Sequence, residues 1–446
     1  MRRYFLIVLL MVCGSRSEAR YSGGAGTADD PYLIGTAQEI AELAADANDW
    51  SLCFRQIAPI DMAELTGDAP PCIGNQDIPF SGVFDGAGQT ISNFATAGRG
   101  DNGVGLFGQL RGYTAQVCNV TLIDPNVQAP DLEYVGALAG RLRSGSITNC
   151  HVVGAHVTGH MGVGGLIGWN QAAVSDCTAT GAITGVYSVG GLAGVTFWCD
   201  DIRDCRVHVT VSGAKRVGGL VGNCALAGVQ WCSASGSVAG QIDVGGLVGA
   251  SDGGLLANCY AQATVTGTEA VGGLLGCNTL SCDCSAGALP GEVRYCYSIG
   301  PVQGTLAVGG LIGLNHKSIV QDSFWDLQTS GQTTSDGGVG LETAALQSEQ
   351  TFAAAHWDFT PKTTSMDYWV MRGPATYPRP AWQIVPGDAD DDGDVDLADF
   401  SLLARDWSKA SSSFCEGGND LTGDACVDIR DIAALSRQWL RGAGSP

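Results

Sequence analysis

The sequence has few charged residues and especially few basic ones. Charged side chains make up 15% of its 446 residues, with 23 Lys and Arg against 45 Asp and Glu, so the formal net charge is −22. A chain of this composition lacks the cationic surface that nucleic-acid phosphates attract. We therefore expect no nucleic-acid partner, and an anionic membrane surface is excluded for the same reason.

Long hydrophobic runs are also missing. A membrane-spanning helix needs about 20 consecutive apolar residues, and the strongest apolar stretch covers only residues 4–13. This stretch follows Arg2 and Arg3 and precedes a small-residue sequence at 17–19, which is the arrangement of an export signal. We expect a signal peptide over residues 1–19, no transmembrane segment, and a secreted protein that is extracellular or associated with a cell surface.

Helical periodicity is scarce through the middle of the chain, whereas glycine is abundant, with 65 residues. Six copies of Val-Gly-Gly-Leu-x-Gly recur at intervals of 26 to 28 residues, with 37 before the last. Fixed-period repetition of this kind indicates a solenoid. The glycines are expected at a corner that needs either positive φ or close approach of two backbones. The copies span residues 163–168, 189–194, 217–222, 244–249, 271–276 and 308–313.

One cysteine falls between each motif and the next. The distance from the cysteine to the following valine is 12 residues in the last five copies, so this arm is nearly fixed. After Cys259, small apolar residues alternate with polar ones, which is typical of a β-strand with one face inward. We expect these cysteines to pack inside the solenoid: Cys118, Cys150, Cys177, Cys205, Cys232, Cys259 and Cys296.

These patterns predict a mainly β fold, a parallel β-helix of about eight coils over residues 104–317. Residues 20–103 are expected to form an N-terminal cap and the first coils, because Thr36 and Glu39 form a capping box that opens a short helix. Aromatic residues replace the small ones over residues 318–383, which predicts a C-terminal cap. Cys277, Cys282 and Cys284 fall in an insertion before the last motif, where loop disulfides are favoured over zinc.

An acidic loop follows the solenoid. Carboxylates recur at alternate positions from Asp388 to Asp399, and Gly393 occupies the sixth position, where an EF-hand calcium loop bends. A second loop, from Asp420 to Asp431, has Ala425 in place of that glycine, so we expect weaker calcium binding there. The expected calcium-binding residues are Asp388, Asp390, Asp392, Asp394, Asp396 and Asp399 in the first loop and Asp420, Thr422, Asp424, Cys426, Asp428 and Asp431 in the second.

Two such loops, each followed by a helix that ends near a tryptophan, resemble the type I dockerin domain over residues 387–441. The resemblance implies a small all-α module that folds with Ca²⁺ and docks into a cohesin domain on an extracellular partner. It also implies that Leu397, Ala398, Ile429 and Arg430 face that partner. The repeats, from about residue 103 to 382, resemble the GLUG-motif solenoids of secreted bacterial proteins, which implies a β-helix and leaves activity open.

Two functions remain open for the solenoid. Asp176 and Asp204 precede cysteines of adjacent coils and are expected to point outward, one above the other, which suits a polysaccharide lyase or glycoside hydrolase. The arm between each last glycine and the next cysteine varies more, and it carries aromatic, amide and acidic side chains that suit glycan binding. These expected ligand-face residues are Trp169, Phe197, Trp198, Asp200 and Asp201, with Asn170, Asp252, Asn278, Asn315 and His316.

The sequence favours the binding protein over the enzyme. The sequence therefore predicts a secreted β-solenoid that binds or adheres, with polysaccharide as the expected ligand, and that attaches through a calcium-dependent dockerin. The alternative is a polysaccharide-degrading β-helix carried by the same module.

Overall fold

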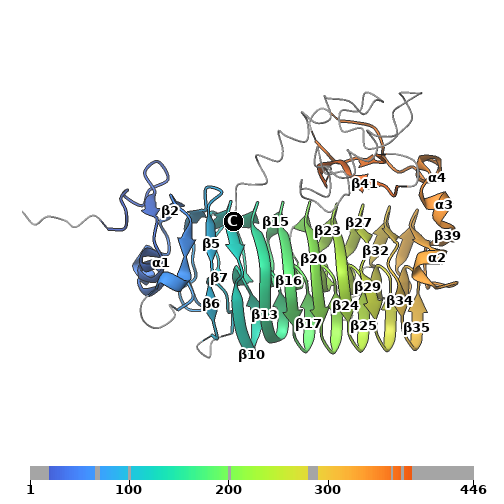
Figure 1. The fold of residues 1–446 in the computed structure, drawn as a ribbon, viewed down its shortest axis with the longest axis horizontal. Coiled ribbons are helices and arrows are strands. Elements are labelled where there is room, and N and C mark those ends of the chain that lie inside the picture. Colours follow the sequence, from blue (N-terminus) through green and yellow to red (C-terminus); the bar gives the residue numbers. More distant parts are fainter. Residues whose placement is uncertain are drawn as a thin grey trace, which may run out of the picture.

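The structure is a computed structural model, and it describes residues 20–65, 71–98, 102–198, 202–279, 290–362, 365–372 and 376–383. Within them the chain forms a parallel β-solenoid of about nine turns, stacked along the long axis of the molecule (Figure 1). The predicted mainly β solenoid is confirmed, with one turn more than the repeats suggested. The expected signal peptide over 1–19 and the expected calcium module over 387–441 lie outside the described residues.

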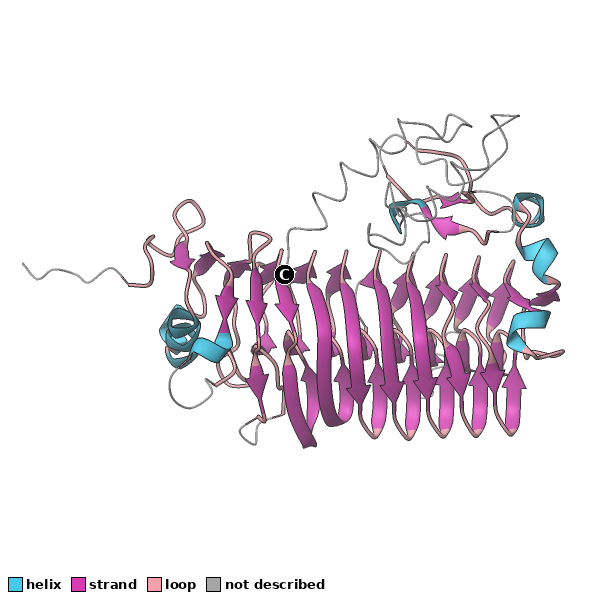
Figure 2. Cartoon of the chain, in the orientation of Figure 1, coloured by secondary structure: helices cyan, strands magenta, loops and turns pink. Residues whose placement is uncertain are grey.

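Three parallel sheets form the walls of the solenoid (Figure 2). Sheet A has 11 strands and contains the segment just before each cysteine position. Its strands are β1 (Tyr32–Ile34), β2 (Cys53–Gln56), β4 (Val83–Asp85), β8 (Gln116–Cys118), β12 (Ser146–Thr148), β15 (Ala173–Ser175), β19 (Ile202–Arg203), β23 (Gly228–Gln230), β27 (Leu255–Ala257), β32 (Glu292–Arg294) and β37 (Ile319–Gln321).

Sheet B has 20 strands and contains the segments between each cysteine position and the following motif. Its strands are β3 (Ile60–Asp61), β5 (Thr90–Ser92), β6 (Ala95–Thr96), β9 (Thr121–Ile123), β10 (Asn126–Gly136), β13 (His151–Gly164), β16 (Thr178–Thr184), β17 (Tyr187–Gly190), β20 (Arg206–Ser212), β21 (Lys215–Gly218), β24 (Ser233–Ala239), β25 (Ile242–Gly245), β28 (Tyr260–Ala261), β29 (Thr264–Thr266), β30 (Glu269–Gly272), β33 (Tyr297–Ser298), β34 (Val302–Gln303), β35 (Leu306–Gly309), β38 (Phe324–Asp326) and β39 (Val339–Leu341).

Sheet C has eight strands, which follow the Leu of each motif. Its strands are β7 (Phe107–Leu110), β11 (Ala139–Leu142), β14 (Ile167–Asn170), β18 (Ala193–Phe197), β22 (Val221–Ala225), β26 (Val248–Asp252), β31 (Leu275–Thr279) and β36 (Ile312–Asn315). The register pairs the motif with itself, because Val217 lies opposite Val189 and Val244 in the neighbouring coils. Equivalent residues therefore form columns that run along the solenoid.

The motif glycines are required by close approach of backbones. A Cβ added at Gly245 would lie 1.9 Å from the carbonyl oxygen of Val248 and 2.7 Å from the backbone nitrogen of Gly276 in the next coil. Positive φ occurs instead at the residue before the motif valine, as at Arg216 (φ 58°) and Asp243 (φ 57°). Of the two reasons expected for the glycines, close approach is therefore the one that applies.

This geometry predicts the effect of adding one methyl group at the corner. Gly245→Ala should lower the free energy of unfolding by about 3 kcal/mol or more, because backbone atoms of two coils cannot move apart without breaking the ladder. Gly35→Ala is the control, since its Cβ would lie 3.2 Å from Cγ1 of Ile57, a side chain that is 48% exposed and can move. Denaturant unfolding of both variants checks the prediction; equal losses would contradict it.

The cysteine column lies inside the solenoid, as predicted for six of its seven expected members. The inward placement expected for Cys118 was wrong, because Cys118 lies opposite Thr148, two residues before the column position that Val120 holds, and is only partly buried. Cys150, Cys177, Cys205, Cys232, Cys259 and Cys296 are all fully buried free thiols. Each thiol donates to the carbonyl two residues earlier, as Cys232 Sγ does to Gln230 O at 3.1 Å, across a residue of positive φ. Ser323 occupies the next position and donates to Gln321 O at 2.7 Å. The column thus satisfies carbonyls at the corner, and burial raises the pKa of the thiols of Cys150, Cys177, Cys205, Cys232 and Cys259.

The placement expected for Cys277 was wrong. It lies within β31, opposite Ala250 and Leu314, and not in the insertion, because that strand continues to Thr279. Its thiol is free among the described residues, while Cys282 and Cys284 lie outside them.

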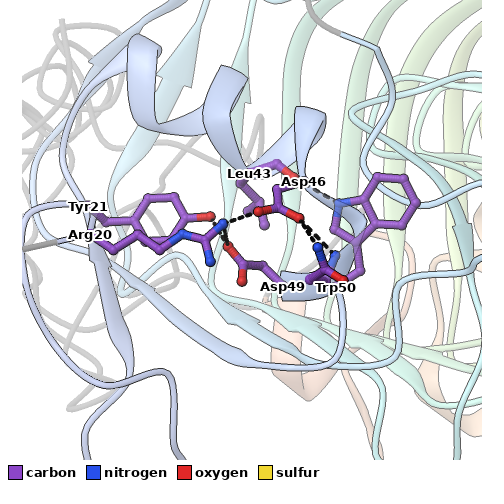
Figure 3. A network of polar contacts seen from close by, with 7 residues as sticks. Arg20, Tyr21, Leu43, Asp46, Asp49 and Trp50 are labelled. Atoms are coloured by element: carbon purple, nitrogen blue, oxygen red, sulfur yellow. Dashed lines mark hydrogen bonds and ion pairs between the residues drawn. The ribbon is translucent and has the colours of Figure 1, made fainter.

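A short helix covers the first coil. Helix α1 (Ala37–Ala45) begins with the predicted capping box: Thr36 Oγ1 accepts from Glu39 N, and Glu39 Oε2 accepts from Thr36 N. Figure 3 shows the network behind it, in which the nearly buried Asp49 accepts from Tyr21 Oη at 2.5 Å and pairs with Arg20 at 2.7 Å. Trp50 Nε1 also donates to Leu43 O at 2.8 Å. These contacts fix the helix over the open end.

The C-terminal segment folds back along the solenoid flank (Figure 1). It contains α2 (Leu327–Ser330), α3 (Thr343–Leu346), α4 (Glu349–Ala354) and the antiparallel pair β40 (Trp369–Val370) and β41 (Arg379–Pro380). Trp369 packs against Tyr260 and Tyr297, whose rings stack at 5.1 Å on adjacent coils. Gln383 then bonds to Ser233 and Tyr260. The segment therefore covers outward aromatic side chains of sheet B.

No helix in the described part of the chain is long and apolar enough to cross a membrane.

Candidate functional site on the outward face of sheet C

Side chains alternate along the strands of sheet C, and one column points inward. Asn170, Thr196 and Asn278 belong to this column and are 0% exposed. The expectation that Asn170 and Asn278 contribute to a ligand face was therefore wrong, because the strand period turns both amides into the interior.

The adjacent column points outward and begins with Gln109, Arg141 and Trp169 in successive coils. Trp169, an expected ligand-face residue, is half-buried there and its ring lies 4.7 Å from the ring of Tyr134. The guanidinium of Arg141 lies 4.5 Å from the Tyr134 ring, and that of Arg143 lies 4.8 Å from the Trp169 ring. We call Tyr134, Arg141, Arg143 and Trp169 the arginine–aromatic cluster.

Two further aromatic residues end the next strand on the same face. Phe197 closes β18, and Trp198 follows it with φ 50° and 71% of its surface exposed. Their ring centroids lie 6.0 Å apart. Asp200 and Asp201 lie outside the described residues. The structure thus brings the three expected aromatics, Trp169, Phe197 and Trp198, to neighbouring strands of sheet C.

Further along, the same face carries opposite charges. Asp252 accepts a hydrogen bond from Thr279 Oγ1 at 2.6 Å and lies 3.7 Å from the guanidinium of Arg216. Burial raises the pKa of Asp243 nearby, against the charges of Lys215 and Arg216. Here the acidic groups have cationic neighbours. Asn315, an expected ligand-face residue, lies opposite Asn278 and so belongs to the inward column, where its Nδ2 donates to Ser318 O. His316 follows it.

The expected pair Asp176 and Asp204 lies on a different flank, at the corner before the cysteine column. Both have positive φ, and Asp176 is exposed. Arg203 binds Asp204 Oδ2 at 3.3 Å and also binds Asp367 of the C-terminal segment at 2.6 Å. The pKa of Asp204 is raised to about 6, because burial and the charges of Asp367 and Asp176 together outweigh the lowering effect of Arg203. This network ties the C-terminal segment to the solenoid.

The raised pKa of Asp204 makes stability depend on pH. Because the folded pKa of about 6 exceeds the ordinary value of 3.8, the native state binds the proton more tightly than the unfolded state. The resulting stabilisation is complete below pH 3.8 and is lost as the pH rises through 6, up to about 3 kcal/mol. Asp204→Asn should therefore gain stability relative to the wild type between pH 4 and about 7.

Urea unfolding of both proteins at several pH values measures this difference. Asp77→Asn is the control, because Asp77 is an exposed carboxylate away from the network. A pH-independent difference between Asp204→Asn and the wild type would contradict the assignment.

Tyr134, Arg141 and Arg143 were missed in the sequence. Tyr134 precedes the loose motif copy at 135–140, and Arg141 occupies the position that Trp169 holds one coil later. Aligning the loose copy with the full motifs would have placed both residues on this face. What the repeat alone does not reveal is that the two guanidinium groups lie against the aromatic rings.

Comparison with known proteins supports the repeat assignment. The model of the GLUG motif matches residues 159–184 and 240–266. Halomucin of Haloquadratum walsbyi is 33% identical over 221 residues, which is 48% of this chain and 2% of halomucin. This chain thus spans only a small part of halomucin's length.

Among solved structures, the crystal structure of a candidate immunoglobulin A1 protease from Bacteroides ovatus superposes with a TM-score of 0.44 at 22% identity, covering 82% of this chain and 96% of that one. The chain thus carries matches to the GLUG motif within a parallel β-solenoid.

Proposed function

We propose that this protein is a secreted β-solenoid that binds polysaccharide on the outward face of sheet C. The observation that carries the proposal is the gathering of Tyr134, Trp169, Phe197 and Trp198 with two arginines on neighbouring strands. Aromatic rings stack on the apolar faces of sugars, and adjacent N–H donors bind their oxygens. The C-terminal segment packs on side chains of sheet B, whereas Trp198 on this face is 71% exposed.

A long, straight sheet also suits an extended ligand. Equivalent side chains of successive coils are about 4.8 Å apart, and the strands of sheet C continue in register from β7 to β36. A polymer that runs along this axis meets several coils at once, so weak contacts add. An enzyme would need acid and base groups facing such a ligand, whereas Asp204 already pairs with Arg203.

The test measures retention of the protein on immobilised neutral and acidic polysaccharides, together with release of reducing or unsaturated ends. Trp198→Ala should weaken retention about tenfold, because it removes an exposed stacking surface worth about 1 kcal/mol or more. Tyr113→Ala is the matched control, since Tyr113 is a fully exposed aromatic residue elsewhere. Unchanged retention of Trp198→Ala would contradict the proposed face. Released ends that disappear in Asp204→Asn would support the enzyme instead.

We further propose that residues 387–441 attach the solenoid to a cohesin domain of an extracellular partner. The alternating carboxylates from Asp388 to Asp399 support calcium binding, because Ca²⁺ prefers several oxygen ligands around one bent loop. Leu397, Ala398, Ile429 and Arg430 would then face the partner.

Calcium removal tests this attachment. Chelation should abolish part of the helical circular dichroism and leave the β signal of the solenoid unchanged, since the two parts fold on different interactions. Asp388→Asn combined with Asp390→Asn should have the same effect, whereas Asp29→Asn combined with Asp30→Asn should not. Helicity that is insensitive to chelation would refute the calcium assignment.

A further inference from the structure

We propose that the arginine–aromatic cluster is a binding site for an oxyanion, the carboxylate or sulfate group of an acidic polysaccharide. This inference rests on the proposed function and names its ligand class. The cluster combines the buried guanidinium of Arg141, the exposed guanidinium of Arg143 and the indole N–H of Trp169. Hydrogen-bond donors of Arg141 and Trp169 have no acceptor among the described residues.

Arg141 is a buried cation whose charge is not compensated within the described residues. It is 6% exposed, and Nη1 donates to Gln76 Oε1 at 3.3 Å, which is a neutral acceptor. Its Nε is buried without a hydrogen-bond partner, and no carboxylate of the described residues forms an ion pair with it. Burying an unpaired charge costs several kcal/mol. A bound anion would offset that cost.

A second cation, Arg143, lies near Arg141. Burial lowers the pKa of Arg141 and the neighbouring charge of Arg143 lowers it further, while Tyr134 and Glu133 raise it. Arg143 is exposed, and its Nη1 donates to Gln171 Oε1 at 2.9 Å. Two cations that repel each other are held on one face of an otherwise acidic protein. An anion between or beside them would relieve that repulsion.

The aromatic rings orient the donors. The guanidinium groups lie over ring faces, with Arg141 near Tyr134 and Arg143 near Trp169. A guanidinium that stacks on a ring keeps its N–H edge available for a carboxylate or sulfate oxygen. Trp169 Nε1 is a third donor, buried and without a partner. The rings therefore fix both cations at low entropic cost and leave their donors unsatisfied.

A cavity of about 280 Å³ lies near the cluster and is lined by residues that include Gly74, Asn75, Asn102 and Gly103. Arg141 does not line it, but the lining residue Gly103 is close to Arg141, because a Cβ added at Gly103 would be 3.6 Å from Arg141 Cγ. With a net charge of −22 the protein repels dense polyanions such as nucleic acid, so a sugar chain with spaced anionic groups fits better.

Calorimetric titration of the full chain tests the site. The ligands are oligogalacturonate for the carboxylate, a sulfated galactan oligosaccharide for the sulfate, and methyl-esterified oligogalacturonate as the neutral control. Arg141→Met should weaken binding of at least one acidic ligand more than about tenfold and leave the neutral control unchanged. Arg143→Gln should have a smaller effect in the same direction, because that side chain is exposed. Arg55→Gln is the control, an exposed arginine on sheet A.

Thermal melting separates binding from folding. Arg141→Met should melt at or above the wild-type temperature without ligand, because it removes an unpaired buried charge, and acidic ligand should raise the melting temperature of the wild type alone. Equal affinity for acidic and neutral chains, or wild-type affinity in Arg141→Met, would overturn the oxyanion site and leave polysaccharide binding standing. Failure of every chain to bind would overturn both.

Discussion

The solenoid depends on how closely its successive backbones can approach one another at one corner of each coil. At that corner, the positions of Gly218, Gly245 and Gly272 leave no space for a methyl group. Each Cβ would stand about 2 Å from the carbonyl oxygen three residues later in its own coil and 2.6 to 2.7 Å from a backbone nitrogen of the next coil. Close approach keeps neighbouring coils in register, and register stacks the cysteine, valine and leucine columns. Each coil contacts mainly its neighbours, so a defect at one corner exposes the interior columns on both sides.

A repeat that specifies packing cannot by itself specify a ligand. Function requires side chains that differ from coil to coil, and these lie where the repeat tolerates change. The outward face of sheet C is such a place: its column reads Gln109, Arg141, Trp169, Val195 and Asn223 in successive coils. The outward aromatic side chains of sheet B are not available to a ligand, because Trp369 and its neighbours cover them. One flank thus holds the C-terminal segment, and another carries side chains that vary from coil to coil.

Much of this architecture could be predicted from the sequence, because it repeats. The period, the inward cysteines and the capping box at Thr36 each follow from local spacing, and the structure contains all three. Contacts made by residues far apart could not be predicted in this way. Asp367 reaches Arg203 across 164 positions, and Arg141 reaches Gln76 across 65. The inward direction of Asn170 was missed for a simpler reason. The sequence did not establish which residues of the sheet C strands point inward, so Asn170 was assigned to the surface because its side chain is polar.

The central claim is that the outward face of sheet C binds an acidic glycan through Arg141 and Arg143. A crystal structure of the complete chain with a bound oligogalacturonate tests it most directly. The account predicts a carboxylate within hydrogen-bond distance of Arg141 Nε or Arg143, with the sugar chain running over Trp169 toward Trp198. An oligosaccharide bound on another flank, with Arg141 Nε still without a partner, would contradict it.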